Sequence, residues 1–224
     1  MHRHGCFVTG TDTGIGKTLA SSALLHALHA RGLRAVGMKP VASGCEATAD
    51  GWRNEDALAL QAASDPTPAY ADINPYALPL PLAPELAARD AGVEVELAPL
   101  LAAHARLRAL APRVVVEGVG GWEAPLSASL RQADLVRALG LPVVLVVGLR
   151  LGCLNHAILS ARAIAADGFP LLGWIGNAID PGMACREEQR AMLQARIAAP
   201  CIGWLPHAAE ADGRAFSRYL TLPD

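Results

Sequence analysis

The sequence predicts an α/β protein of a single domain with a doubly wound, mostly parallel sheet. Short apolar runs alternate along the chain with longer amphipathic segments, as in folds that alternate strands and helices. Several short runs are rich in β-branched residues and show no alternation of apolar and polar positions. This is expected of strands that helices cover on both faces. The length of 224 residues suits one domain.

The elements follow one another in a regular strand–helix order. We expect strands at 6–9, 35–39, 114–117, 143–147, 172–177 and 202–204. We expect helices between them at 17–31, 55–63, 97–110, 130–139, 153–167 and 183–197. Right-handed crossovers between parallel strands place such helices on both faces of the sheet. Ligands of these sheets bind at the carboxyl ends of the strands.

One stretch, 65–84, interrupts this order. Its sequence, "DPTPAYADINPYALPLPLAP", contains six prolines, and we expect no helix within it. It is either a plain linker or an ordered segment that crosses the strand ends. In a one-domain chain the second interpretation is at least as good as the first. We therefore expect the segment to form part of a substrate pocket.

Composition excludes several classes of protein. A net charge of −2 leaves no strongly basic surface for nucleic acid or for an anionic membrane. The longest apolar run, "LPVVLVVG", is far shorter than the roughly 20 residues that span a bilayer. The first residues lack the apolar stretch of a secretory signal. Five scattered cysteines without a C-x-x-C pair indicate reduced thiols in a cytoplasmic protein.

The stretch "FVTGTDTGIGKT", residues 7–18, is typical of a phosphate-binding loop. The usual pattern is Gly-x-x-x-x-Gly-Lys-Ser/Thr, but Gly10 lies one residue too far from Gly16. Glycines let main-chain N–H groups surround an anion, and the following helix start adds positive charge. Lys17 can reach the β- and γ-phosphates, and Thr18 can bind Mg²⁺. The alternative is a glycine-rich turn with a surface lysine.

Lysine is rare in this chain. Of the 19 basic residues only Lys17 and Lys39 are lysines, which suggests that a compact charge on a flexible stem matters at both positions. Lys39 ends the predicted second strand, in "GMKPVASG", so it could bring a second cation to the phosphate site. Ser43 follows in a loop that could contact substrate. Lys39 alone could equally be an ordinary surface lysine.

Two carboxylates are further candidates. Glu117 ends the run "RVVVE", and a carboxylate at the end of a buried strand points to the place where Mg²⁺ and nucleotide bind. The alternative is a carboxylate bonded to nearby backbone. Asp56, in "WRNEDALAL", lies near a helix start, where an acid is commonly a favourable charge and nothing more. His26 and His29 are best read as solvated helix residues rather than metal ligands.

Together these stretches resemble one family. The matching stretches are "FVTGTDTGIGKT", "GMKPVASG", "RNEDALALQ", "NPYALPLPLAP", "VVVEGVGGWEAPL", "LPVVLVVGLRLGCLNHAILSARAI" and "GWIGNAID", which cover nearly the whole chain. The long loop followed by K-P-V-A-S-G, E-G-x-G-G-W and L-G-C-x-N-H is specific to dethiobiotin synthetase, the ATP-dependent enzyme of biotin synthesis. The additional loop residue resembles that family's own variant, G-x-x-x-x-x-G-K-T.

The resemblance implies a P-loop NTPase-like fold and a reaction that joins CO₂ to 7,8-diaminopelargonate. One amine would capture CO₂ as a carbamate, whose oxygen would take the γ-phosphate of ATP. The second amine would then close the ureido ring of dethiobiotin and expel phosphate. The family is a homodimer whose interface helps to complete the substrate pocket.

The resemblance also implies roles for residues of this chain. Lys17 and Lys39 would be catalytic, and the Mg²⁺ ligands would be Thr18, Asp56 and Glu117, which replaces the simpler interpretation of Asp56. ATP would be bound by Thr13, Gly14, Ile15, Gly16, Lys17, Thr18, Asp56, Glu117, Gly118, Gly120, Asn177, Pro206, His207 and Ala208. The substrate would contact Thr13, Lys39, Ser43 and, from the partner, Gly152, Cys153, Leu154 and Asn155. The alternative for the last four is ordinary helix capping.

Two other functions remain to be weighed. A P-loop switch or partitioning ATPase could share the fold, but such proteins often carry a lysine early in the loop, where this chain has "TDT". A synthetase domain of a glutamine-dependent amidotransferase could also share it, but the chain has no Cys-His nucleophile pattern. A pure nucleotide-binding module would require Lys39 and Glu117 to be incidental.

Overall fold

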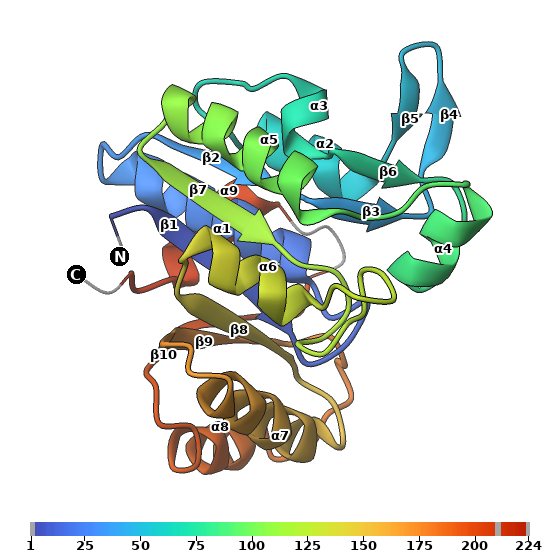
Figure 1. The fold of residues 1–224 in the computed structure, drawn as a ribbon. Coiled ribbons are helices and arrows are strands. Elements are labelled where there is room, and N and C mark those ends of the chain that lie inside the picture. Colours follow the sequence, from blue (N-terminus) through green and yellow to red (C-terminus); the bar gives the residue numbers. More distant parts are fainter. Residues whose placement is uncertain (1–2, 209–211, 223–224) are drawn as a thin grey trace.

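A computed structural model of the chain describes residues 3–208 and 212–222. Its main sheet contains six parallel strands in the order β10-β9-β8-β1-β7-β2 (Figure 1). These strands are β1 (Gly5–Gly10), β2 (Ala35–Met38), β7 (Arg113–Glu117), β8 (Val143–Gly148), β9 (Leu171–Asn177) and β10 (Cys201–Leu205). Each of the six predicted strands is present, with ends that differ by one residue at most.

Both faces of the sheet are apolar because alternate residues of a strand pack into different cores. In β8, Val143 and Leu145 belong to one core, while Val144 and Val146 belong to the other. Helices cover both cores (Figure 1). The first core is covered by α5 (Leu97–Leu110), α6 (Gln132–Leu139), α7 (Cys153–Ala166) and α8 (Arg186–Gln194), and the second by α1 (Lys17–Ala30), α9 (Gly213–Phe216) and the 3-10 turn η1 (Ser217–Tyr219). This explains why the strands show no polar alternation.

The strand order creates a crevice at one end of β1. The chain leaves β1 through α1 to β2 at the sheet edge and returns to β7, which lies between them. It then passes through α6 to β8 on the other side of β1. The chain therefore turns in opposite directions from the two sides of β1. Ligands of doubly wound sheets bind at this reversal, outside the carboxyl ends of the strands.

The segment between β2 and α5 contains more structure than the sequence predicted. Its elements are β3 (Val41–Ser43), β4 (Glu46–Thr48), β5 (Gly51–Arg53), α2 (Glu55–Ala62), α3 (Tyr70–Ile73), β6 (Tyr76–Leu78) and α4 (Pro84–Asp90). Only α2 was predicted among these. β3 pairs with β6 in parallel, and β4 and β5 form an antiparallel hairpin that projects from the molecule (Figure 1).

The expectation of no helix within 65–84 was wrong. The single turn α3 forms there because Pro68 precedes it and Pro75 follows it, so that no proline interrupts its hydrogen bonds. Pro84 begins α4, where its missing N–H group is not needed. The six predicted helices are all present, with ends that differ by three residues or fewer.

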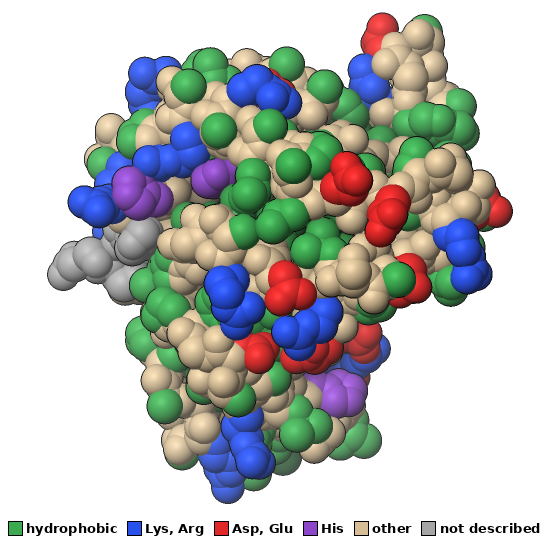
Figure 2. Space-filling model, viewed as in Figure 1, with side chains coloured by type: hydrophobic (Ala, Val, Ile, Leu, Met, Phe, Trp, Pro, Cys, Tyr) green, Lys and Arg blue, Asp and Glu red, His purple; other side chains and the backbone are tan. Residues whose placement is uncertain are grey.

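The charge of the surface bears on whether the protein binds nucleic acid. On the face shown in Figure 2, basic and acidic side chains are interspersed around α6. Arg131 and Arg137, for example, both pair with Asp134. The surface around α6 is therefore not a continuous basic surface of the kind that nucleic acid requires. None of the described helices has the length and apolar character needed to cross a bilayer.

Candidate active site

The structure has the strand–loop–helix arrangement predicted for residues 7–18. β1 ends at Gly10, and α1 begins at Lys17. Gly16 has φ 84° and precedes the first turn of α1, and Gly14 has φ 71°. A Cβ atom added to Gly16 would lie 2.1 Å from Nδ2 of Asn177. Both its left-handed backbone and this close approach therefore require glycine at position 16.

Lys17 reaches back across its own loop. Its side chain is buried, and Nζ donates a hydrogen bond to the main-chain oxygen of Asp12 at 2.8 Å. Burial, followed by the positive charge of Lys39, lowers the pKa of Lys17 to about 8. The Asp12 carboxylate pairs with Arg150, which lies just beyond β8. The loop is thus tied both to its own lysine and to a neighbouring strand end.

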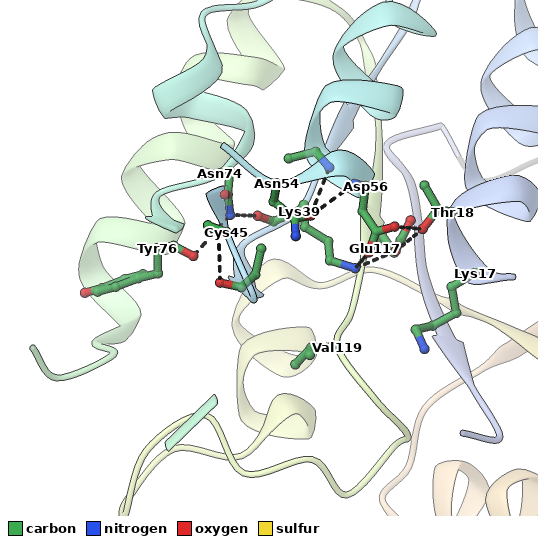
Figure 3. A network of polar contacts seen from close by, with 12 residues as sticks. Lys17, Thr18, Lys39, Cys45, Asn54, Asp56, Asn74, Tyr76, Glu117 and Val119 are labelled. Atoms are coloured by element: carbon green, nitrogen blue, oxygen red, sulfur yellow. Dashed lines mark hydrogen bonds and ion pairs between the residues drawn. The ribbon is translucent and has the colours of Figure 1, made fainter. Parts of the chain in front are cut away.

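Four side chains that are far apart in the sequence meet at the carboxyl end of β7 (Figure 3). They are Thr18 of α1, Lys39 after β2, Asp56 of α2 and Glu117, the last residue of β7. Lys39 Nζ donates to Asp56 Oδ2 at 2.7 Å and to Glu117 Oε1 at 2.6 Å. Thr18 Oγ1 lies 2.6 Å from Asp56 Oδ1 and 2.9 Å from Glu117 Oε1. Its single hydroxyl hydrogen can be donated to one of them at a time.

The charges of this cluster stabilise one another. Glu117 is fully buried and Lys39 nearly so. Burial acts to lower the pKa of Lys39, but the carboxylates of Glu117 and Asp56 outweigh it and raise that pKa above its ordinary value. Burial acts to raise the pKa of Asp56, but the charge and hydrogen bond of Lys39 outweigh it and lower that pKa. Lys39 and Asp56 are therefore both charged at neutral pH.

The oxygen atoms of the cluster fit a small divalent cation. Thr18, Asp56 and Glu117 supply a hydroxyl and two carboxylates, the hard oxygen ligands that Mg²⁺ prefers. Glu117 Oε2 is buried and has no hydrogen-bond partner among the described residues, so it could accept a ligand. In the described part of the chain, no group of three or more His, Cys, Asp or Glu side chains could hold a metal. A cation here would therefore need water or phosphate oxygens as well.

A pocket of about 910 Å³ opens beside the cluster. The predicted site residues that line it are Thr13, Gly14, Gly16, Lys17, Thr18, Lys39, Ser43, Asp56, Glu117 and Gly120. Sequence reasoning did not identify the apolar part of the lining, which comes from Ala42, Val119, Ala124 and Pro125. The end of the Pro-rich segment, residues 81–84, also lines the pocket.

Other predicted nucleotide contacts lie around the loop. Asn177 is buried at the end of β9 and donates from Nδ2 to the main-chain oxygen of Ile15 at 2.9 Å. The Ile15 side chain belongs to the core, so only its backbone faces the loop. Gly118 packs closely against α6, since an added Cβ would lie 2.3 Å from Oε1 of Gln132. Residues 206–208, which are Pro206, His207 and Ala208, are exposed after β10 and do not line the pocket.

The predicted contacts at the start of α7 lie apart from the Lys39 cluster. Gly152 has φ 95° at the helix start, and Cys153 is buried beneath it. Leu154 is half-buried and Asn155 is exposed. None of these four residues lines the 910 Å³ pocket of this chain.

Two positioning residues were missed from the sequence. Asn54 begins α2 and accepts hydrogen bonds on Oδ1 from the N–H groups of Asp56 at 3.1 Å and Ala57 at 3.3 Å. Its position before "ED" is a helix-capping signal that could have been recognised. Gln132 is buried and holds the loop after Glu117, accepting from Val119 N at 2.9 Å and donating to Gly121 O at 2.8 Å. No local pattern marks it.

Comparison with known proteins decides the family. A family model described as AAA domain matches residues 4–215. A protein of Xanthomonas oryzae pv. oryzae named ATP-dependent dethiobiotin synthetase is 67% identical over 97% of both chains. One of Xylella fastidiosa with the same name is 68% identical over 90% of this chain and 89% of its own. This chain belongs to the dethiobiotin synthetase family. It is accordingly an enzyme of the ligase type, which confirms the resemblance found in the sequence.

Distant solved structures confirm the P-loop NTPase-like fold of this synthetase. A ParA family ATPase from Chlorobium tepidum TLS aligns with a TM-score of 0.55 and 12% identity, over 93% of this chain and 86% of its own. The MinC:MinD complex of Aquifex aeolicus aligns with a TM-score of 0.57 and 12% identity, over 92% and 82%. Identity this low supports the fold alone.

Proposed function

We propose that this synthetase uses ATP and Mg²⁺ to join CO₂ to 7,8-diaminopelargonate and form dethiobiotin. The observation that carries the proposal is the contact of Lys39 with both Asp56 and Glu117 beside the phosphate loop. It occurs in a chain that is 67% identical to a protein named ATP-dependent dethiobiotin synthetase. Phosphoryl transfer depends mainly on positioning and electrostatics, which such a cluster supplies.

Thr18, Asp56 and Glu117 would hold Mg²⁺ together with the nucleotide. Bound there, Mg²⁺ would neutralise charge on the β- and γ-phosphates. Glu117 Oε2, which has no partner among the described residues, is the oxygen best placed to take part. Asn54 would keep Asp56 aimed at the cation by capping α2.

The proposed reaction proceeds through two intermediates. One substrate amine attacks CO₂ and loses a proton, which gives a carbamate. A carbamate oxygen then attacks the γ-phosphorus, the bond to the ADP oxygen breaks, and a carbamic-phosphoric anhydride forms. The second amine attacks the carbamate carbon, the bond to the phosphate oxygen breaks, and a proton passes to the departing phosphate. One CO₂ oxygen remains in the ureido ring, and the other leaves with phosphate.

Two lysines make the meeting of these anions possible. The carbamate and the γ-phosphate repel each other, so their approach requires fixed positive charge. Lys17 and the loop N–H groups would bind the phosphates, and Lys39 would stabilise the charge that moves during transfer. The two carboxylates fix Lys39 before substrate arrives, so little reorganisation is needed. Thr13 and Ser43 would contact the diamine and carbamate, and Ser43 Oγ is buried without a partner among the described residues.

The remaining contacts follow from the arrangement around the pocket. The adenine would lie against Asn177 and the exposed residues 206–208, and the loop backbone from Gly14 to Gly16 would surround the phosphates. The end of the Pro-rich segment 65–84 would cover the substrate, since residues 81–84 line the pocket. All of these groups would belong to one domain.

We also infer that the enzyme is a cytoplasmic homodimer. Residues 152–155 lie outside this chain's pocket, and the neighbouring Leu151 is 92% exposed. The start of α7 of a second copy would bring its N–H groups to the substrate carboxylate. All five cysteines lie within the described residues and are free thiols, as in a reducing compartment. Sedimentation of the purified protein would test the dimer, and a monomer at assay concentrations would contradict it.

The activity is tested by phosphate release from Mg-ATP and bicarbonate, with and without 7,8-diaminopelargonate. We expect release that depends on the diamine and matches the dethiobiotin found by mass spectrometry. Equal release in both reactions would contradict the proposal and would favour a switch-type ATPase of the same fold.

A further inference from the structure

The Pro-rich segment is connected to the active-site cluster by a short chain of hydrogen bonds. Tyr70, the first residue of α3, accepts on its hydroxyl from the N–H of Asn54 at 2.8 Å and donates to Asn74 Oδ1 at 3.1 Å. Asn74, the residue directly after α3, donates from Nδ2 to the main-chain oxygens of Lys39 at 2.8 Å and Tyr76 at 3.1 Å. Asn54 and Asn74 are both buried.

One branch of this chain leads to Asp56. The Tyr70 hydroxyl fixes the backbone of Asn54, and Asn54 Oδ1 in turn accepts from the N–H of Asp56. The position of the Asp56 carboxylate therefore depends on a helix cap that Tyr70 holds in place. The Tyr70 ring is itself covered by the Arg53 guanidinium, 4.2 Å from its centre.

The other branch leads to Lys39. Its main-chain N–H donates to the oxygen of Ile73 at 2.8 Å, and its main-chain oxygen accepts from Asn74. Both polar backbone groups of Lys39 are thus held by the end of α3. In Figure 3, Asn74 contacts the Lys39 backbone, while the Lys39 side chain extends away toward Asp56 and Glu117.

The two branches meet, because Lys39 Nζ contacts Asp56 Oδ2 at 2.7 Å. The result is a closed ring of contacts that passes through Lys39, Asn74, Tyr70, Asn54 and Asp56. In a closed ring each member is held from two sides, so its geometry is more restricted than in an open chain. Release of one contact should shift Lys39 and Asp56 relative to each other.

We propose that Tyr70 and Asn74 are positioning residues, which hold Lys39 and Asp56 in a fixed relative position for Mg-ATP binding and phosphoryl transfer. The inference rests on the roles given to Lys39 and Asp56 in the proposed function. Neither Tyr70 nor Asn74 lines the 910 Å³ pocket, so both act through their neighbours. The Pro-rich segment is then a support for the catalytic cluster as well as a wall of the pocket.

The chain offers a matched pair of variants. Tyr70→Phe removes the hydroxyl group that belongs to the closed ring of contacts. It keeps the aromatic side chain over which the Arg53 guanidinium lies. Tyr76→Phe removes a hydroxyl from the same segment, one that accepts from Glu96 N at 3.1 Å and has no link to the ring. Asn74→Ala removes the acceptor of the Tyr70 hydroxyl and the donor to the Lys39 main-chain oxygen, but the bond from the Asn54 N–H to Tyr70 remains. The double variant Tyr70→Phe/Asn74→Ala tests whether the two residues act together.

The full chain is assayed for kcat and for ATP binding by calorimetry over a range of Mg²⁺ concentrations. For Tyr70→Phe we expect about a five- to tenfold loss both in kcat and in Mg²⁺-dependent ATP affinity, because the variant loses the two hydrogen bonds of the hydroxyl. Tyr76→Phe should stay within about twofold of wild type in both, with a similar melting temperature. Asn74→Ala should lower kcat further, and the double variant should lose less than the product of the two single losses, because both single variants break the Tyr70–Asn74 bond.

Several results would overturn the inference. Equal values of kcat and ATP affinity for Tyr70→Phe and Tyr76→Phe would do so, as would additive losses in the double variant. A loss confined to the melting temperature would show a purely structural role. A wild-type protein that releases no diamine-dependent phosphate would contradict the proposed function instead. In that case, the ATP affinities of the two tyrosine variants would still decide this inference.

Discussion

Replacement of Lys39 by glutamine removes the positive charge that the proposed mechanism uses in phosphoryl transfer. Lys39 Nζ is buried and lies 2.6 Å and 2.7 Å from oxygens of two carboxylates, so its position is fixed before transfer. A prearranged donor of this kind contributes about 3–4 kcal/mol to the transition state, or roughly 10²–10³ in kcat. The glutamine amide can still donate to one carboxylate but carries no charge. ATP affinity should stay nearly unchanged, because the loop and Lys17 hold the phosphates.

Turnover is measured as dethiobiotin formed at saturating substrates, and ATP affinity is measured by calorimetry. Arg190→Gln is the control, since it removes a cation whose ion pair with Glu187, at 4.0 Å on the surface of α8, is weak. It should leave kcat and ATP affinity as in wild type. Turnover of Lys39→Gln within a few-fold of wild type would refute the role of Lys39. An equal loss of ATP affinity and turnover would assign Lys39 to nucleotide binding instead.

Three further results are expected. Gly16→Ala should abolish ATP binding and destabilise the fold, because the added Cβ would collide with Asn177. Gly14→Ala has open space around it, so backbone strain should lower its free energy of unfolding in urea by only about 1 kcal/mol. Burial, followed by the charges of Arg108 and His4, lowers the pKa of His104 from 6.5 to about 4, so the unfolded chain binds a proton in this window that the folded chain does not. The free energy of unfolding should therefore fall as pH falls from 6.5 toward 4, and less so in His104→Gln; identical pH profiles would contradict this. Chelation of divalent cations with EDTA should abolish turnover yet leave the melting temperature of the ligand-free protein unchanged, since Lys39 already pairs with both carboxylates when no cation is bound.

The parts of the site that the sequence predicted follow from parallel topology. Lys39 and Glu117 were placed together because the carboxyl ends of neighbouring parallel strands lie at one edge of the sheet. The loop was recognised because its glycines and lysine have a local spacing that chemistry dictates. These inferences needed no knowledge of distant contacts, and the structure brings all of these residues into one pocket.

The parts that were missed depend on contacts between distant segments. Asp56 lies in the first turn of α2, as its neighbouring residues in the sequence suggested. Whether its side chain also faces Lys39 depends on how α2 packs. Only the family resemblance indicated that role. α3 lies between two prolines, and Asn74 directly after it donates to the main-chain oxygen of Lys39, 35 residues away. Gln132 reaches Thr9 across 123 residues of sequence, and no local pattern can show such a contact.

The most direct test of the central claim follows the oxygen atoms of CO₂. In the proposed reaction a carbamate oxygen becomes the bridge to phosphorus and leaves with phosphate. The enzyme is mixed with ATP, Mg²⁺, the diamine and freshly dissolved CO₂ labelled with heavy oxygen, and is quenched before the label exchanges with water. We expect one labelled oxygen in the released phosphate and one in the dethiobiotin. Phosphate without label would mean that ATP is hydrolysed by water, which would contradict the carbamic-phosphoric anhydride and the role given to the Lys39 cluster.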